Sequence, residues 1–232
     1  MMKPMLRAIA PGLCLLALLA PAAAPAQSNR AEGFSKLPPG AKIALLPMDI
    51  ELFEISAGGV AEPRADWTRT ALQHVKDLLR ERKAKIGAQV VDLEDDGSEQ
   101  VAELNRLHGA VGVAIVMHHY GPLTLETKDR KLDWTLGAEA DVLRQRSGAD
   151  YALFTYIRDS YASGDRIAIM IAGLLFRQLL HPGSNQQGYA SLVDLRTGQI
   201  VWFNRMLRLT GDLRDRTKAA ETLDALLSEF PQ

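Results

Sequence analysis

The stretch GYASLVDLRTGQIVWFN, residues 188–204, decides how this chain folds. Two runs rich in β-branched and aromatic residues, Tyr189–Leu195 and Ile200–Asn204, flank the short loop Arg196–Gln199, which contains a glycine. A short glycine-containing loop between two such runs is a specific signal for a β-hairpin. The chain is therefore expected to contain a sheet with a hairpin near its C-terminal end.

Three further runs upstream of the hairpin are predicted to be strands. Lys42–Met48 is continuously apolar after its first residue, which is typical of a strand covered on both faces. Gln89–Leu93 is a short run with two adjacent valines, and Ala149–Ile157 is rich in aromatic and β-branched residues. Between the first two runs, Asp49–Arg64 is predicted to be a long loop.

Helices are predicted between and after these strands. Residues 65–83 repeat apolar side chains at three- and four-residue spacing, which indicates an amphipathic helix. Further helices are expected from Ser98 to about residue 120, over Trp134–Arg146, and from near Asp212, while Ile167–Leu180 is a helix or a buried apolar segment. The order predicts an α/β fold (an α+β mixed sheet): a small, three-layer-like domain with a C-terminal β-hairpin and flanking helices.

The N-terminus has the three-part layout of a secretory signal peptide. Lys3 and Arg7 precede an apolar run, and Ala24-Pro25-Ala26 supplies small residues before Gln27. We therefore expect residues 1–26 to be a signal peptide cleaved after Ala26, and the mature protein to be periplasmic or secreted. Residues 27–40 are predicted to be a flexible leader and residues 41–232 a single α/β domain.

The composition of the mature chain limits what it can do. Cys14, the only cysteine, lies within the signal peptide, so the mature chain has no disulfide, thiol nucleophile or cysteine-ligated metal. Removing Lys3 and Arg7 changes the formal net charge from −1 to −3, which gives no reason to expect a nucleic-acid partner. The longest later apolar run, Ile167–Phe176, is too short for an integral membrane segment.

Three segments of the chain resemble a known group of envelope proteins. KIALLP at residues 42–47, GADYAL at 148–153 and LVDLRTGQIVW at 192–202 are similar to the motifs of the CsgG/LpoB/TolB N-terminal-domain-like periplasmic α/β family. The order of predicted elements also resembles that family over residues 41–230. The resemblance implies an accessory or assembly factor of the cell envelope, with one or more envelope proteins as partners and with a homo-oligomer possible.

Signals for catalysis are weak throughout the sequence. His118 and His119 are adjacent, so on a helix they project about 100° apart and cannot easily bind one metal ion. No metalloprotease motif, phosphate-binding loop or serine-nucleophile elbow is present. We therefore predict no catalytic residue, no metal and no cofactor.

The most informative polar stretch is RDSYASGDR, residues 158–166. It follows the strand that begins at Ala149, so it is expected at a strand's carboxyl end, where open α/β sheets bind ligands. Asp49, Glu51 and Glu54 follow the first strand and are expected at the same rim. The binding residues predicted there are Asp49, Glu51, Glu54, Arg158, Asp159, Tyr161, Asp165 and Arg166. The same stretch also fits a solvated strand extension with internal ion pairs.

Two functional interpretations remain open at this point. In the first, the rim recognises an envelope protein by charge complementarity, without catalysis. The alternative is a periplasmic hydrolase or small-ligand-binding protein that uses the strand-end carboxylates. A concave pocket with convergent carboxylates or histidines would favour the second, and an exposed sheet edge would favour the first.

Overall fold

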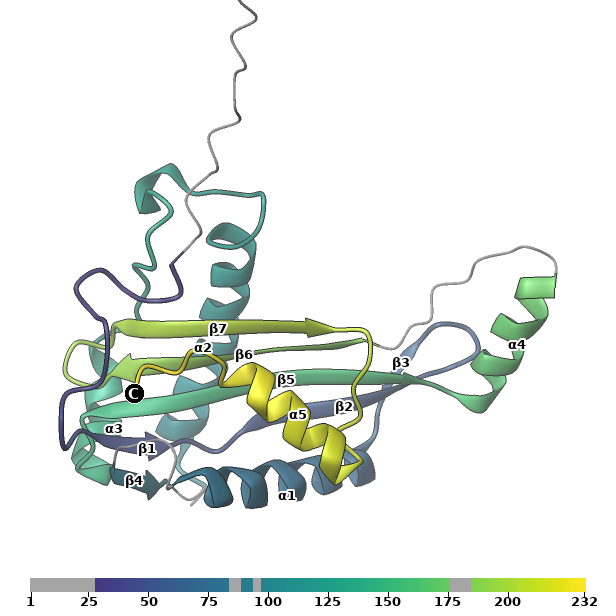
Figure 1. Cartoon of the computed structure of the whole chain (residues 1–232), viewed down its shortest axis with the longest axis horizontal. Helices are drawn as coiled ribbons and strands as arrows, with labels where there is room; N and C mark the ends of the chain where they lie inside the picture. The colour runs from purple at the N-terminus through teal and green to yellow at the C-terminus, as the bar shows by residue number, and fades with distance from the viewer. Residues whose placement is uncertain (1–27, 84–88, 94–96, 176–184) are drawn as a thin grey trace, which may run out of the picture.

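The computed structural model describes residues 28–83, 89–93, 97–175 and 185–232, in which a seven-stranded mixed sheet lies between two layers of helices (Figure 1). The α/β fold class predicted from the sequence is confirmed. The strands are β1 (Lys42–Leu45), β2 (Asp49–Ile55), β3 (Ala61–Pro63), β4 (Gln89–Asp92), β5 (Tyr151–Ala162), β6 (Gln186–Asp194) and β7 (Ile200–Arg208). The helices are α1 (Ala65–Arg82), α2 (Glu99–His118), α3 (Asp141–Ser147), α4 (Gly164–Leu175) and α5 (Arg216–Leu226), with 3₁₀ turns at Glu126–Lys128 and Ala138–Ala140.

Each face of the sheet has its own hydrophobic core. On one face, α1 and α5 pack through residues such as Val75 and Leu223 against the inward side chains of the sheet. On the other face, α2 and α3 pack through Leu104 and Leu143 against a second buried cluster around Phe154. The alternation of β5 serves both cores, because its odd-numbered residues face α1 and its even-numbered residues face α2.

The long strand β5 organises the sheet. Its pairing with β6 is antiparallel and runs from Tyr151 to Asp159 along one edge. Because β6 occupies that edge, β1 and β2 share the opposite one, where both run parallel to β5 and follow each other in line. Leu45 pairs with Leu153 and Asp49 with Tyr156, so the β1–β2 line carries one extra residue at Leu46–Met48.

This arrangement corrects the prediction of a loop over Asp49–Arg64. Its first seven residues form β2, in which Ile50 and Leu52 are buried and alternate with polar side chains. Only the turn before β3 is irregular. Period-two alternation was readable in the sequence, but the glycine pair downstream favoured a loop.

Two other predicted elements differ from the structure. The helix predicted over Trp134–Arg146 is reduced to a 3₁₀ turn and α3, because Trp134 and Leu136 form backbone hydrogen bonds with the β6–β7 hairpin. In addition, β5 does not end at Ile157 but continues to Ala162. The polar stretch from Arg158 to Ala162 therefore lies within the strand, and does not follow its end.

Residues 28–40, predicted to be a flexible leader, lie against the domain. Ala31 and Leu37 are buried, the Ala31 N–H donates to Val201 O, and the Leu37 N–H donates to Pro231 O. These apolar contacts and backbone hydrogen bonds hold the segment along β7 and beside the C-terminus. The signal peptide prediction, over residues 1–26, lies outside the described residues, as does the end of the apolar segment predicted to reach Leu180.

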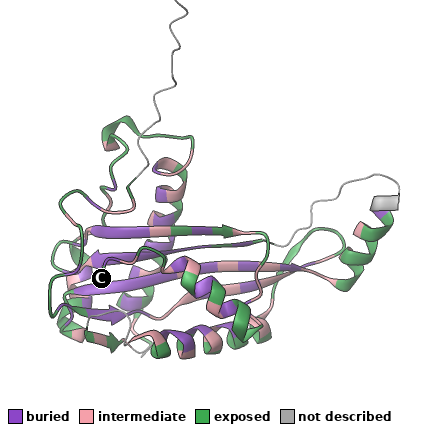
Figure 2. Cartoon of the chain, viewed as in Figure 1, coloured by how far each residue is buried: buried purple, intermediate pink, exposed green. Residues whose placement is uncertain are grey.

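Among the described residues, no helix combines the length and apolar character that crossing a bilayer requires. Helix α4 projects away from the sheet at the end of β5 (Figure 1). Most of its described side chains are exposed (Figure 2).

Candidate functional site

The eight residues predicted to form one binding rim are distributed over four places. Asp159 and Tyr161 point into the core between β5 and α5. The Tyr161 hydroxyl donates a hydrogen bond to the Asp159 carboxylate and accepts one from the Leu213 N–H at 2.9 Å. Gln186 Nε2 donates to Asp159 Oδ2 at 2.7 Å, and Thr222 donates to Gln186 in turn. These side chains join β5, β6 and α5, so they stabilise the fold.

The buried network changes the ionisation of both groups. Burial raises the pKa of the Asp159 carboxyl above its ordinary value, although hydrogen bonds from Tyr161 and Gln186 act in the opposite direction. Burial, and then the charge of Asp159, raise the pKa of the Tyr161 hydroxyl. Asp159 is 1% exposed, so it is not available to a docking partner.

Arg158, Asp49 and Glu51 do come together, on the opposite face of the sheet. Arg158 Nη1 lies 2.7 Å from Asp49 Oδ1, and its Nε lies 3.4 Å from Glu51 Oε2. The guanidinium also lies over the Tyr156 ring, 4.0 Å from its centroid. Burial disfavours the charge of Arg158, but the hydrogen bond and charge of Asp49 outweigh it and hold the pKa of Arg158 above its ordinary value. The parallel register of β2 and β5 produces this cluster.

The remaining predicted residues lie elsewhere. Glu54 is on the α1 face, where its Oε2 lies 2.5 Å from Arg64 Nη1. Asp165 and Arg166 belong to the first turn of α4, where the Arg166 N–H donates to Ser163 Oγ. The sequence therefore predicted correctly that the segment with Asp49 and Glu51 meets the segment with Arg158. It did not predict which face of the sheet each side chain lies on.

A groove of about 630 Å³ opens next to the Arg158 cluster, between α2 and the far end of the sheet. Val113, Val116 and Met117 of α2 form one wall, and the other lining residues belong to β5, β6 and β7. Val113 is 45% exposed and Met117 is 44% exposed. The groove therefore presents apolar side chains to solvent, which on a folded surface marks a contact site.

An aromatic stack forms the base of this face of the sheet. Tyr156 and Tyr189 stack with centroids 4.6 Å apart, Tyr189 stacks on Phe203 at 5.4 Å, and Phe203 stacks on Tyr120 at 5.9 Å. Arg158 lies over the Tyr156 end and Arg205 lies over the Tyr120 end. Burial raises the pKa of Tyr120 to about 12, so this ring stays neutral beneath its arginine. Tyr156 and Tyr189 of this stack line the groove, and an arginine lies over each end of the stack.

The outer edge of β7 is only partly covered. Over Val201–Phe203 it forms backbone hydrogen bonds with residues 29–31. In an antiparallel ladder the N–H and C=O of alternate residues point to the same side, so those of Arg205 and Leu207 also point outward. No backbone hydrogen bond among the described residues covers these two positions. In Figure 1 this end of β7 lies open beside α2.

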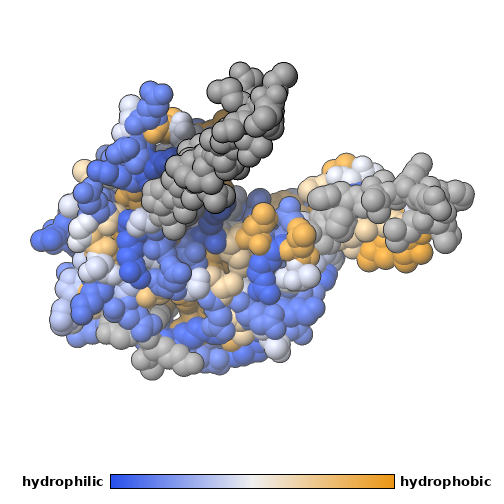
Figure 3. Space-filling model, turned by 45° about the horizontal axis from the view of Figure 1, so that its top comes forward, coloured by the Kyte–Doolittle hydropathy of each residue, from blue (hydrophilic) through white to orange (hydrophobic). Residues whose placement is uncertain are grey.

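Helix α4 forms a second apolar surface. Ile167, Ile169 and Ile171 are each about half exposed, at 47%, 46% and 59%. The space-filling view shows apolar side chains gathered at this projecting end of the molecule (Figure 3). Successive isoleucines two residues apart lie on opposite sides of a helix, so the apolar surface extends around it.

The histidines that the structure describes do not converge on a metal site or a nucleophile. His118 Nδ1 lies 2.6 Å from Leu123 O, whereas His119 Nε2 lies 2.8 Å from Ser28 O. His108 is fully buried against Phe154, with Nε2 2.8 Å from Ser191 Oγ. Within the described part of the chain, no group of three or more His, Cys, Asp or Glu residues is arranged to hold a metal ion.

Sequence reasoning missed the groove and the open edge. The strand β7 continues past Asn204 to Arg208. Whether other segments cover its outer edge depends on packing between distant parts of the chain, which no local pattern indicates. The apolar residues of the run Gly109–Met117 extend around α2, and Val113 and Met117 reach solvent. The width of that apolar run was the available signal.

No family model matches this chain, and no curated protein matches it. Among solved structures, the PelC dodecamer from Paraburkholderia phytofirmans is 12% identical, with 85% of this chain and 93% of that chain covered and a TM-score of 0.37. The LpoB C-terminal domain from Escherichia coli is 14% identical, with coverages of 77% and 87% and a TM-score of 0.31. Lipoprotein GNA1162 from Neisseria meningitidis is 13% identical, with coverages of 82% and 99% and a TM-score of 0.31. The LpoB domain, whose family motifs this sequence resembles, is thus among the similar structures, at a level that assigns neither a family nor a function.

Proposed function

We propose that this chain is a non-catalytic interaction module of the cell envelope that binds a protein partner by adding one of the partner's strands to the open end of β7. The observation that carries the proposal is the uncovered edge at Arg205 and Leu207 beside an exposed apolar groove. An unpaired edge offers a row of backbone donors and acceptors to an extended segment.

The edge and the groove suit the two requirements of strand addition. Backbone hydrogen bonds to Arg205 and Leu207 would supply affinity, and the groove would select every second side chain of the added strand. Leu207 is 72% exposed and Val113 is 45% exposed, so apolar side chains of the partner gain burial there. Folded chains rarely leave such an edge bare, which supports a binding role for it.

The charges around the groove indicate the partner's composition. Arg205 lies over Tyr120, and Arg158 lies over Tyr156 at the other end of the aromatic stack. Arg158 is already neutralised by Asp49 and Glu51, whereas no ion pair of Arg205 occurs among the described residues. We therefore infer a partner segment that alternates apolar residues and carries an acidic residue opposite Arg205.

The alternative of a hydrolase or small-ligand binder using the predicted carboxylates has less support. Asp49 and Glu51 both contact Arg158, and Glu54 contacts Arg64. Carboxylates that are held by guanidiniums lack the free geometry that general acid–base work needs. Asp159 is enclosed in the core, away from any substrate.

The test is site-specific photo-crosslinking in the native host. A photoreactive phenylalanine analogue is placed at position 207 of the full chain, and, as a matched control, at Arg106 on the exposed side of α2. We expect a single covalent adduct from position 207 and none from position 106. Adduct mass distinguishes a second copy of this chain from a different envelope protein.

A backbone variant separates strand addition from side-chain contact. Leu207→Pro removes an N–H that points away from β6, so the β6–β7 ladder stays intact. Leu207→Ala removes the side chain but keeps the N–H. We expect the proline variant to lose the adduct formed from a probe at position 205, and the alanine variant to retain part of it. Equal adduct yield from both variants, or no adduct from position 207, would exclude this edge as the docking site.

A further inference from the structure

A second cavity lies between α1 and the strands β1 and β4, away from the groove beside β7. On the outer side of the β1–β2 line, β4 pairs with β1 and β3 pairs with β2. Neither of these strands pairs with Leu46–Met48, which lie between β1 and β2. Helix α1 runs beneath this gap. The space between them is a cavity of about 510 Å³ at the carboxyl ends of the parallel strands β1 and β4. Its size lies in the range of small-molecule sites, about 300–1,000 Å³.

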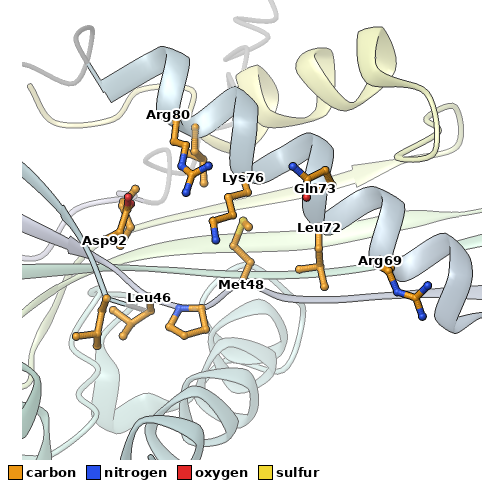
Figure 4. Close-up of a pocket in the computed structure, with 12 residues that line it drawn as sticks. Leu46, Met48, Arg69, Leu72, Gln73, Lys76, Arg80 and Asp92 are labelled. Carbon is orange, nitrogen blue, oxygen red and sulfur yellow. The ribbon is translucent and has the colours of Figure 1, made fainter. Parts of the chain in front are cut away.

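The wall that α1 contributes is cationic. Arg69, Gln73, Lys76 and Arg80 line the cavity at intervals of four, three and four residues, which places them in one row along the helix. Figure 4 shows Lys76 and Arg80 extending from α1 toward the strands, with Arg69 at the far end of the row.

These cations have few anionic partners. Arg80 lies 3.8 Å from Asp77, whereas Asp92, the one acidic residue that lines the cavity, has its carboxylate 2.7 Å from Lys83. Neither Arg69 nor Lys76 forms an ion pair within the described part of the chain. Among the described residues that line the cavity, three are cationic (Arg69, Lys76 and Arg80) and one is acidic (Asp92), an excess of positive charge that attracts an anion.

The floor of the cavity is apolar. Leu45 to Met48 form it from the strand side, and Leu72 and Leu79 contribute from α1. Met48 and Leu72 lie between the cationic row and the strands in Figure 4. Leu45, Leu46 and Leu79 are buried, whereas Met48, Leu72 and Leu93 are partly exposed. A small inorganic anion would satisfy the cations but would leave these three side chains in contact with water, so the site matches a ligand that has both a charged head and an apolar body.

We propose that this cavity binds an amphipathic anion, with its carboxylate or phosphate head held by Arg69, Lys76 and Arg80 and its apolar chain lying on Met48 and Leu72. Arginine and lysine head groups bind such anions through charge-assisted hydrogen bonds. The site is independent of β7, which lies on the opposite edge of the sheet. It would give an envelope protein a means of sensing or carrying an acidic amphiphile.

Calorimetric titration of the mature protein with dodecanoate, below the concentration at which it forms micelles, tests the proposal. We expect saturable binding that weakens as the salt concentration rises. The double variant Arg69→Gln, Lys76→Gln should weaken binding about tenfold, whereas Arg106→Gln, an exposed charge on α2, should leave it unchanged. Dodecyltrimethylammonium, with the same chain and the opposite charge, should not bind.

A second arm identifies the source of the anion. Vesicles of phosphatidylglycerol are compared with vesicles of phosphatidylcholine in a flotation assay with the same variants. Binding of dodecanoate alone indicates a free amphiphile, and binding to the anionic vesicles that the double variant loses indicates a lipid headgroup. The proposal is overturned if the double variant binds dodecanoate as tightly as the original chain, or if neither dodecanoate nor anionic vesicles bind. Because these substitutions lie on α1, failure here leaves the β7 proposal untouched.

Discussion

Gly112 is the residue at which α2 comes closest to the sheet. A methyl group added there would overlap the ring of Tyr189. That ring cannot move aside easily, because it is buried between Tyr156 and Phe203 and its hydroxyl donates to Gly109 O at 2.5 Å. Gly109, three residues earlier, has room for a methyl group at ordinary contact distance, 3.6 Å from Tyr156.

The two glycines therefore form a matched pair for a stability measurement. We expect Gly112→Ala to lower the free energy of unfolding by about 1–3 kcal/mol, because overpacking outweighs the gain in helix propensity. Gly109→Ala should raise it, by up to about 1 kcal/mol, because alanine is the better helix former. Urea denaturation of both variants checks this, and equal stability of the two would contradict the close approach of α2 to Tyr189.

Residues also mark where prediction from sequence reached its limit. Arg158 and Asp159 are neighbours and both carry charged side chains. Arg158 is partly exposed beside Asp49, whereas Asp159 is enclosed with Tyr161 and Gln186. Strand alternation alone separates them, and a run of such polar residues does not indicate that a strand continues through it. Of the partners that make Asp159 tolerable in the core, Tyr161 is two residues away, but Gln186 comes from β6 and is itself held by Thr222 of α5, far along the chain.

At the scale of elements, local signals were predictive and distant pairings were not. The β6–β7 hairpin and α1 were predicted correctly because each is specified by its own turn or apolar periodicity. The in-line placement of β1 and β2 depends on β5, about a hundred residues later. The open end of β7 was missed for the same reason, since coverage of an edge depends on what packs beside it.

Helix α4 has the exposed apolar surface from which we predict self-association. Its half-exposed isoleucines form an apolar surface away from the domain, and such a surface favours association with another copy. We expect the mature protein to self-associate over the micromolar range, and Ile169→Glu with Ile171→Glu to make it monomeric. Light scattering after size exclusion measures the mass.

The control for α4 adds the same two charges elsewhere on the surface. Leu123 and Leu125 are 57% and 38% exposed and lie after α2, far from α4 along the chain. Leu123→Glu with Leu125→Glu should leave the association unchanged. A monomeric original chain, or equal effects of the two double variants, would count against α4 as the contact.

At the scale of the whole molecule, each of the two cores encloses a titratable group, Asp159 on the α5 side and His108 on the α2 side, and the two affect stability in opposite directions as the pH changes. Asp159 has a raised pKa in the folded state, so its contribution favours folding at low pH and is lost as the pH rises through that pKa. His108 acts in the opposite direction, because burial lowers its pKa to about 3. Its ring is stacked on Phe154 with the centroids 4.8 Å apart, so a proton on it would be enclosed in an apolar core.

The sign of the His108 effect follows from proton binding in the two states. Below its ordinary pKa of 6.5, the unfolded chain protonates His108 whereas the folded protein does not, down to about pH 3. The free energy of unfolding should therefore fall by up to about 1.4 kcal/mol for each pH unit through that window. The variant His108→Gln can keep a hydrogen bond to Ser191 but does not titrate. Between pH 6.5 and 4.5, we expect the original chain to lose about 2–3 kcal/mol more than this variant in urea denaturation. Parallel pH profiles of the two proteins would show that His108 accepts a proton in the folded state, and would contradict its enclosure between α2 and the sheet.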